Sequence, residues 1–372
     1  MQTRSRFRLL VVRLGAMGDI LHALPAVTAL RQAHPGWVID WVVEPRWSAL
    51  LAAEGSTGRS AASLCGKPDP QQPVVDHLLY AATKEWRKAP FRRQTVQQFQ
   101  DLRRALREGA YDATLDLQGA LRSAAIARMA CKRRRIGEAE PREKAAAWLS
   151  TDLVATHGAH VIEQDLELAA TIAGDELHPM RPWLPLDPAA EVWADAILPP
   201  GAGAPQAILI NPGAGWGAKR WPVERYAAVA QHFAGQGFRI LINTGPGEEP
   251  LAEAIRKEAG GAGLALNCSL AQLIAITRRV ALAIAGDTGP LHLACALGRP
   301  VVGIYGPTDP CRNGPYGTRF KVLRSPESRR DHTRYQAPEA GLLTIRPADV
   351  VRAAEEVLYP ENTLQTAPES CA

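Results

Sequence analysis

Residues 8–34 read RLLVVRLGAMGDILHALPAVTALRQAH, and this stretch decides the fold class. The apolar run at 8–13 predicts a buried strand, because strands covered on both faces read as near-continuous apolar runs. A glycine-bearing turn at 14–19 then leads into a helical pattern that reaches about residue 34. Strand, glycine-rich turn and helix in this order are typical of α/β proteins with a parallel sheet.

The same alternation continues along the chain. In the first half, strands are expected at 38–43 and 111–117, with helices near 100–108 and from about 121. The second half starts a new series. Its expected strands are 207–211, 238–243, 280–285 and 300–305, and its expected helices are 222–235, 248–259, 269–278, 290–297 and 347–358. The pattern predicts two successive Rossmann-like halves.

The length of 372 residues favours two domains, since one domain takes roughly 150 residues. Six prolines fall within 182–205, which we interpret as a linker. We therefore expect an N-terminal domain over 1–181, a C-terminal domain over 206–346, and a last helix with a polar tail over 347–372. The small, polar stretch at 54–73 predicts a mobile loop, and the tail from residue 360 is expected to fray.

Composition narrows the class of protein. With 46% hydrophobic residues the chain can bury a core, so disorder of the whole is excluded. Six cysteines without a CxxC pair argue against a disulfide scaffold or a zinc ribbon. The apolar run at 9–12 is too short for a signal peptide, and no stretch is long enough for a transmembrane helix. A soluble, cytoplasmic protein is expected. Its net charge of +5 permits an anionic partner without requiring one.

Two glycine-rich turns carry candidate chemistry. The turn at 14–19 lacks the dinucleotide pattern GxGxxG, and it ends in Asp19 at a helix start. Asp19 is either a helix cap or a carboxylate able to take a proton from a hydroxyl. The turn at 211–222 misses the P-loop pattern, but its glycines with Lys219 and Arg220 suit a diphosphate. An exposed basic loop is the alternative.

Two further turns follow later strands. At 244–249, Glu248 and Glu249 could bind ribose hydroxyls or serve only as first-turn charges of a helix. At 286–292, Thr288 and backbone N–H groups suit a phosphate at a helix N-terminus. Asp287, Gly289 and His292 belong to the same turn, and so many polar features within seven residues point more specifically to a ligand.

Basic residues gather in the first half of the chain, at Lys84, Arg87, Lys88, Arg92, Arg93 and 132–135. Such runs are often solvated faces, but here they also suit an anionic acceptor or a membrane surface. The histidines show no metal-ligand spacing such as HExxH, so no metal site is expected. No serine or cysteine hydrolase pair is apparent.

Four motifs together resemble glycosyltransferase family 9, the ADP-heptose:lipopolysaccharide heptosyltransferases. They are LGAMGDILHALPAV at 14–27, YDATLDLQG at 111–119, KRWP at 219–222 and GDTGPLHLACALGRPVVGIYGPTDP at 286–310. WRK at 86–88, with DWVVEP at 40–45, is most similar to the heptosyltransferase I branch. The resemblance covers the chain from about residue 8 to residue 358.

The resemblance implies a GT-B fold, in which two Rossmann-like domains face each other across a cleft. By position in the motifs, Asp19 matches the catalytic base and Lys219 the lysine on the diphosphate. Gly18, Asp287, Thr288, Gly289, His292 and either Glu248 or Glu249 match nucleotide-sugar positions, and Arg87, Lys88, Gln118 and Arg122 resemble acceptor-side positions. Three features depart from the family's pattern: the length of 54–73, Lys84 and Glu85 where a more basic pair is common, and the loop NPGAGWGAKRW.

The activity implied is transfer of L-glycero-D-manno-heptose from ADP-heptose to Kdo of lipid A, with inversion and without a metal or other cofactor. The enzyme would act in lipopolysaccharide inner-core synthesis, in the cytoplasm or peripherally on the anionic inner membrane, with no nucleic-acid partner. The nearest alternative is heptosyltransferase II or another family 9 transferase with a different sugar acceptor. A nucleotide-dependent oxidoreductase and a non-catalytic glycan-binding module are remote alternatives.

Overall fold

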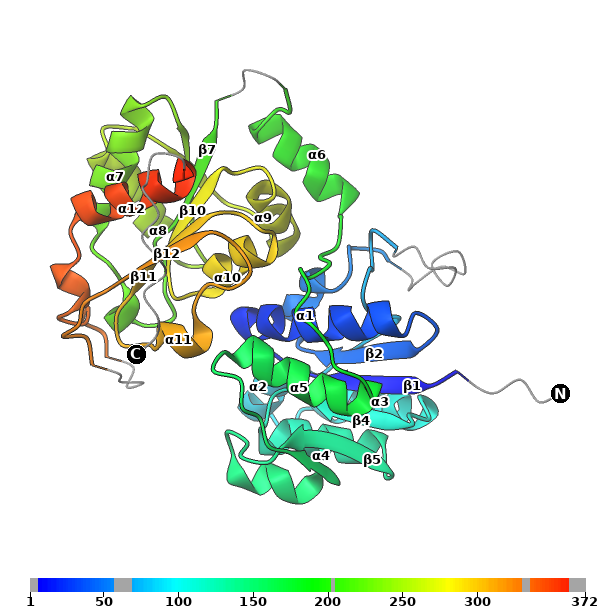
Figure 1. The fold of residues 1–372 in the computed structure, drawn as a ribbon. Helices are drawn as coiled ribbons and strands as arrows, with labels where there is room; N and C mark the ends of the chain where they lie inside the picture. The colour runs from blue at the N-terminus through cyan, green and yellow to red at the C-terminus, as the bar shows by residue number, and fades with distance from the viewer. Residues whose placement is uncertain (1–5, 57–68, 202–204, 330–334, 361–372) are drawn as a thin grey trace. The chain divides into compact units, whose positions relative to one another are not determined.

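The computed structural model describes residues 6–56, 69–201, 205–329 and 335–360. The chain forms two compact units, Met1–Asp187 and Pro188–Ala372, so the division falls inside the stretch expected to be a linker (Figure 1). Most of the loop expected at 54–73, and the tail beyond residue 360, lie outside the described residues.

The first unit is a six-stranded parallel sheet in the order β3-β2-β1-β4-β5-β6. Its strands are β1 (Arg8–Val12), β2 (Val38–Val43), β3 (His77–Tyr80), β4 (Ala113–Asp116), β5 (Arg134–Glu138) and β6 (Asp152–Val154). Its helices are α1 (Met17–Ala33), α2 (Thr83–Lys88), α3 (Arg93–Glu108), α4 (Leu121–Ala130) and α5 (Val161–Ala173), with 3-10 turns η1 (Pro45–Leu50) and η3 (Lys144–Leu149).

The second unit repeats this architecture, with the order β12-β11-β10-β7-β8-β9. Its strands are β7 (Ala207–Asn211), β8 (Arg239–Asn243), β9 (Leu264–Leu266), β10 (Leu282–Gly286), β11 (Val301–Tyr305) and β12 (Phe320–Arg324). Its helices are α6 (Pro188–Ile197), α7 (Val223–Gly235), α8 (Glu249–Glu258), α9 (Leu270–Thr277), α10 (Gly289–Ala296), α11 (Pro310–Asn313) and α12 (Pro347–Leu358), with η4 (Gly217–Lys219) and η5 (Leu342–Thr344).

Helices cover both faces of each sheet. In the first unit α1 packs with α5 on one face and α3 packs with α4 on the other. In the second unit α7 lies beside α8 and α12, while α9 contacts α6 and α10. Burial on both faces explains why the central strands LLVV at 9–12 and AILIN at 207–211 are almost uniformly apolar.

Each sheet has a topological switch point beside its first strand. The chain leaves β1 toward β2 and β3 and later returns to β4 on the other side; β7 and β10 are related in the same way. Ligands of open α/β sheets bind beyond the carboxyl ends of the strands at such points. Residues that follow β1 and β4, and those that follow β7 and β10, are therefore the first candidates for a site.

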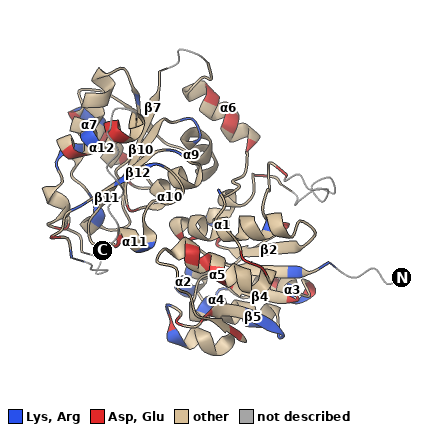
Figure 2. Ribbon diagram, in the orientation of Figure 1, with Lys and Arg blue, Asp and Glu red and all other residues tan. Residues whose placement is uncertain are grey.

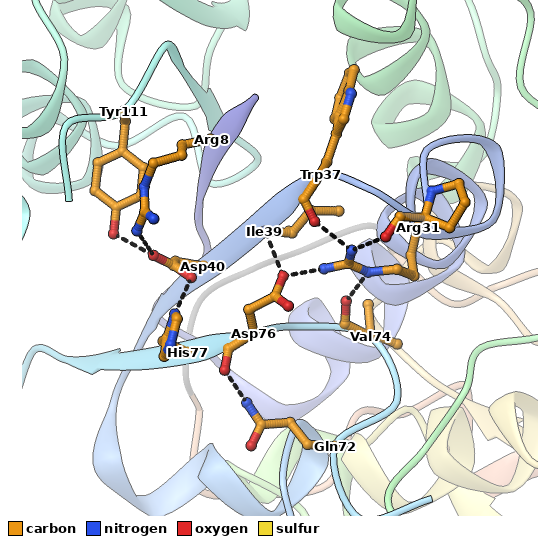
Figure 3. Close-up of polar contacts among 11 residues, drawn as sticks. Arg8, Arg31, Trp37, Ile39, Asp40, Gln72, Val74, Asp76, His77 and Tyr111 are labelled. Atoms are coloured by element: carbon orange, nitrogen blue, oxygen red, sulfur yellow. Dashed lines mark hydrogen bonds and ion pairs between the residues drawn. The ribbon is translucent and has the colours of Figure 1, made fainter. Parts of the chain in front are cut away.

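The opposite, amino edge of the first sheet holds a polar network around the buried carboxylates of Asp40 and Asp76 (Figure 3). Asp40 of β2 accepts hydrogen bonds from the Tyr111 hydroxyl at 2.8 Å and from the Arg8 guanidinium at 3.3 Å, and its other oxygen lies 2.8 Å from Nδ1 of His77. Arg31 of α1 pairs with Asp76 and also donates to the carbonyl of Val74. These contacts tie α1, β1, β2 and β3 together away from the switch point.

Ion pairs fix helix α6 to the rest of the second unit. Figure 2 shows acidic residues along it. Glu191 accepts from Arg278 and Arg279 at 2.6 Å each, and Asp195 accepts from Arg279 at 2.7 Å. The proline-rich stretch that we interpreted as a linker thus contains a helix fixed to α9 and the residues after it.

The expected strands and helices of the central sheets are present, but the outer strands β3, β5, β6, β9 and β12 were not expected. They have only three to five residues, and several carry exposed or polar side chains, so the apolar pattern is weak. Helix α3 also begins at Arg93, earlier than the expected residue 100.

Candidate active site

The second unit has a buried charged cluster at its switch point. Nζ of Lys219, in η4 after β7, lies 2.5 Å from Oδ2 of Asp287, which follows β10. Nε2 of His292, one turn into α10, lies 3.2 Å from the other carboxylate oxygen. Burial alone would raise the pKa of Asp287, but the His292 hydrogen bond and the Lys219 charge hold that pKa well below its usual range. The carboxylate therefore stays ionised and holds Lys219 in place.

The start of α10 adjoins this cluster. Thr288 occupies the N-cap position with extended backbone, and Gly289 is the first helical residue. The Thr288 hydroxyl donates to the carbonyl of Gly286 at 3.2 Å. N–H groups at a helix N-terminus attract anions, so this helix start and the ammonium of Lys219 together suit a diphosphate.

The structure separates the two glutamates that the sequence left equivalent. Glu248 turns toward the loop at 211–222: it accepts from Arg220 at 3.0 Å, and a Cβ on Gly213 would stand only 2.1 Å from its Oε2. Glu249 is solvent-exposed and accepts from the backbone N–H of Gly247 at 3.1 Å. Backbone N–H groups of Glu249 and Gly247 lower the pKa of Glu249. Glu249 therefore stabilises the start of its own helix, while Glu248 faces the loop that carries Lys219.

Sequence reasoning missed a row of polar groups at the ends of β7, β8 and β9. Asn243 donates to Oδ1 of Asn211 at 2.8 Å, and the thiol of Cys268 lies 3.4 Å from Oδ1 of Asn243. Strands β7 (AILIN) and β8 (RILIN) share the ending ILIN, and this repeated asparagine could have revealed the pair Asn211 and Asn243. Trp216 was missed as well; its ring lies 4.5 Å from Nζ of Lys219, within cation–π range.

Asp19 lies in the first turn of α1, after the carboxyl end of β1. Its Oδ2 accepts from the backbone N–H of Ala16 at 2.8 Å, so the capping role is real. Its Oδ1 lies 3.4 Å from the guanidinium of Arg13, and 45% of the side chain is exposed. Asp19 thus accepts from the backbone at the start of α1 and still exposes nearly half of its side chain, so this hydrogen bond does not prevent contact with a substrate.

Gln118 follows β4 on the other side of the same switch point. Its Oε1 accepts from the backbone N–H of Leu14 at 2.8 Å. Asp116, the last residue of β4, accepts from the N–H of Gln118 at 2.9 Å and from the Ser123 hydroxyl at 2.9 Å. Burial raises the pKa of Asp116 to about 6, against the opposing effect of these hydrogen bonds.

The other acceptor-side candidates are exposed. Arg87 and Lys88 end α2, beyond β3, and Arg122 lies in the first turn of α4. Gly18 lies in the first turn of α1, in the first unit, whereas the other nucleotide-sugar candidates all lie in the second unit. The basic run at 132–135 is partly structural: Arg134 pairs with Asp152, and Arg135 is buried and donates to the carbonyl of Leu149.

Among the described residues, no group of three or more His, Cys, Asp or Glu side chains is arranged to hold a metal ion. Within the same ranges, no helix has both the length and the apolar character needed to cross a membrane.

Comparisons with known proteins agree on one family. Residues 99–342 match the model of glycosyltransferase family 9 (heptosyltransferase). The chain is 29% identical to lipopolysaccharide heptosyltransferase 1 of Escherichia coli K12, over 86% of this chain and 94% of that protein. It is 28% identical to the Pseudomonas aeruginosa protein of the same name, over 83% and 81%.

A solved structure shares the fold. The E. coli heptosyltransferase WaaC with ADP-2-deoxy-2-fluoro heptose matches with a TM-score of 0.73 and 27% identity, over 94% of this chain and 99% of that one. The chain has two parallel six-stranded sheets flanked by helices, and together with this match they confirm the expected α/β class and GT-B fold.

Proposed function

The chain belongs to glycosyltransferase family 9, and from that premise we propose that it transfers L-glycero-D-manno-heptose from an ADP-sugar to Kdo of lipid A. The enzyme is a glycosyltransferase similar to heptosyltransferase 1 over most of its length. The proposed place of the reaction is the synthesis of the lipopolysaccharide inner core.

The second unit would hold the donor. The diphosphate of ADP-heptose would lie between Lys219 and the start of α10, where the Thr288 hydroxyl and helix N–H groups point to anions. Glu248 rather than Glu249 would accept from the ribose hydroxyls, because it faces the loop at 211–222. Asp287 and His292 would orient Lys219.

The first unit would hold the acceptor and the base. Asp19 would take the proton of the Kdo hydroxyl as the hydroxyl oxygen attacks the anomeric carbon of heptose. The bond between that carbon and the phosphate oxygen breaks, and ADP leaves with the electron pair. Attack from the face opposite to the leaving group inverts the anomeric configuration. Lys219 and the α10 N-terminus would stabilise the charge that develops on ADP, so the proposal assigns this role to protein groups and needs no metal.

The exposed cations of the first unit would meet the acidic acceptor. Along the chain, Phe91 is flanked by Arg87, Lys88, Arg92 and Arg93, and Phe91 itself is 94% exposed. Cations around an exposed aromatic ring suit the anionic surface of a membrane, where the ring enters the apolar layer. We propose a cytoplasmic enzyme that contacts the inner membrane peripherally through the loop at 87–93, which joins α2 to α3 and includes their ends. This contact agrees with the lipid nature of the proposed acceptor.

The observation that carries the proposal is the buried Lys219–Asp287–His292 cluster at the switch point of the second sheet. A calorimetric titration with ADP, ADP-heptose, UDP-glucose and NADH, without added metal, tests it. Selective binding of the two ADP ligands is expected. Preference for UDP-glucose or NADH would refute the donor assignment. Preference for UDP-glucose would favour another transferase, and preference for NADH would favour an oxidoreductase.

A further inference from the structure

We propose that Gln118 is a positioning residue for Asp19, acting through the backbone of Leu14 rather than by binding the acceptor. This inference rests on the proposed function, because it assumes that Asp19 is the base. It differs from the role that the motif resemblance implies, which places Gln118 on the acceptor side.

Leu14 is the residue that leads from β1 toward α1. Its backbone N–H donates to Oε1 of Gln118 at 2.8 Å, and its carbonyl accepts from the N–H of Glu44 at 3.0 Å. The Leu14 side chain is buried at 1% exposure. The Leu14 backbone is therefore held on one side by a residue that follows β4 and on the other by a residue that follows β2.

Gln118 is itself held at the end of β4. Asp116 accepts from the backbone N–H groups of Gln118 and Gly119, at 2.9 and 3.3 Å, with a single carboxylate oxygen. The other oxygen accepts from the Ser123 hydroxyl in α4 at 2.9 Å. Asp116 is buried, so these bonds lie in a low-dielectric environment where they strengthen one another. The side chain of Gln118 consequently starts from a backbone that is fixed to both β4 and α4.

Only two residues separate Leu14 from α1. Gly15 has φ of +149°, and a Cβ there would stand 2.6 Å from Nε1 of Trp47, so the turn has little room to relax. Ala16 then donates to Asp19, and Arg13 approaches the same carboxylate from the other side. A displacement of Leu14 would therefore pass directly to the groups that orient Asp19.

Two variants of Gln118 separate the two roles. Gln118→Met keeps the length of the side chain and removes the acceptor oxygen, whereas Gln118→Glu keeps an oxygen for Leu14. If Gln118 positions Asp19, Gln118→Met lowers kcat roughly 10- to 100-fold with little change in the acceptor KM, and Gln118→Glu restores most of the rate. If Gln118 binds the acceptor through Nε2, both variants raise the acceptor KM, and the added charge of Glu makes it the worse of the two. That second pattern overturns the inference.

Hydrogen exchange supplies a readout that needs no substrate. Amides of the segment 9–20 should exchange faster in Gln118→Met than in the wild type and return to the wild-type rate in Gln118→Glu. Gln97→Met, at an exposed position of α3, is the control and should change neither exchange nor kcat. Unchanged exchange in Gln118→Met would overturn the inference even in an active enzyme. If the variants change exchange as predicted but the wild-type protein transfers no heptose, the proposed function is refuted and the positioning of the segment 9–20 by Gln118 is not.

Discussion

The ammonium nitrogen of Lys219 lies 2.5 Å from a carboxylate oxygen of Asp287, and only 10% of each side chain is exposed. A buried charge is costly unless it is paired, so the Asp287 carboxylate offsets the charge of Lys219 and fixes the position of its ammonium group. A bound diphosphate would share this cation with Asp287. The pair thus links the fold of the second sheet to the proposed binding of ADP.

Lys219→Ala should weaken ADP binding. The variant removes a charge-assisted contact worth about 1.5–3 kcal/mol and leaves the Asp287 carboxylate facing the diphosphate, so Kd should rise roughly tenfold or more. Calorimetry measures this change. Lys257→Ala, at an exposed lysine of α8, is the matched control and should bind like the wild type. An unchanged Kd for Lys219→Ala would contradict the assignment.

Asp19→Asn should abolish most transfer while leaving donor binding intact. The amide keeps an oxygen for the Ala16 N–H but cannot take a proton, and general-base catalysis typically contributes 10²- to 10⁴-fold. The rate of heptose transfer should fall by about 10²-fold or more, with ADP affinity unchanged. Near-normal transfer by a folded Asp19→Asn protein would show that another group is the base.

The two neighbouring glutamates should differ. Glu248→Gln should weaken binding of both ADP and adenosine several-fold, since a hydrogen bond to a charged acceptor is worth more than one to a neutral amide. Glu249→Gln is its matched control and should bind both ligands normally, because Glu249 faces solvent and its carboxylate accepts from the backbone at the start of α8. Equal losses in the two variants, or a loss only in Glu249→Gln, would reverse the assignment.

The contact between His77 and Asp40 should make stability depend on pH (Figure 3). The hydrogen bond that His77 donates to the Asp40 carboxylate raises the pKa of His77 above 6.5, although partial burial opposes it. A raised pKa in the folded state stabilises the protein below the unfolded-state pKa, and this contribution is lost as pH rises through the folded-state pKa. His77→Gln should therefore lower Tm at pH 6, and the difference from the wild type should shrink at pH 9. A difference that grows with pH would contradict this sign.

Phe91→Ser should reduce binding to vesicles that contain anionic lipid. Burial of a phenylalanine side chain is worth about 1.5–3 kcal/mol, so the partition coefficient should fall roughly tenfold or more. Co-sedimentation with vesicles measures it. Val192→Ser replaces an apolar side chain on α6 that is 70% exposed and serves as the control. If both variants bind vesicles like the wild type, the loop at 87–93 does not enter the membrane.

Much of this arrangement could be predicted from the sequence. The strands at 8–12, 207–211 and 282–286 are apolar runs, and each leads into a turn that contains glycine. The positions of Asp19, Lys219 and Asp287 after the carboxyl ends of strands therefore followed from local pattern. The identification of these residues as a site came from the motifs at 14–27, 219–222 and 286–310, whose family is now confirmed. Their individual roles stay predictions.

Contacts between distant segments could not be predicted. The bond from Leu14 to Gln118 joins residues 104 apart, and the ion pair of Lys219 with Asp287 joins residues 68 apart. Helical patterns and turn motifs describe neighbours along the chain, whereas these pairs meet because β4 returns beside β1 and β10 beside β7. The choice between Glu248 and Glu249 likewise depended on which side chain turns toward Gly213.

Mass spectrometry of the acceptor shows whether this protein transfers heptose. The purified protein is incubated with ADP-L-glycero-D-manno-heptose and Kdo-lipid A, and with acceptors that already carry heptose in parallel. Kdo-lipid A should gain the mass of one heptose, and an equal amount of ADP should be released. Transfer only to the heptose-bearing acceptors, or release of ADP without any change in acceptor mass, would refute the proposed transfer to Kdo.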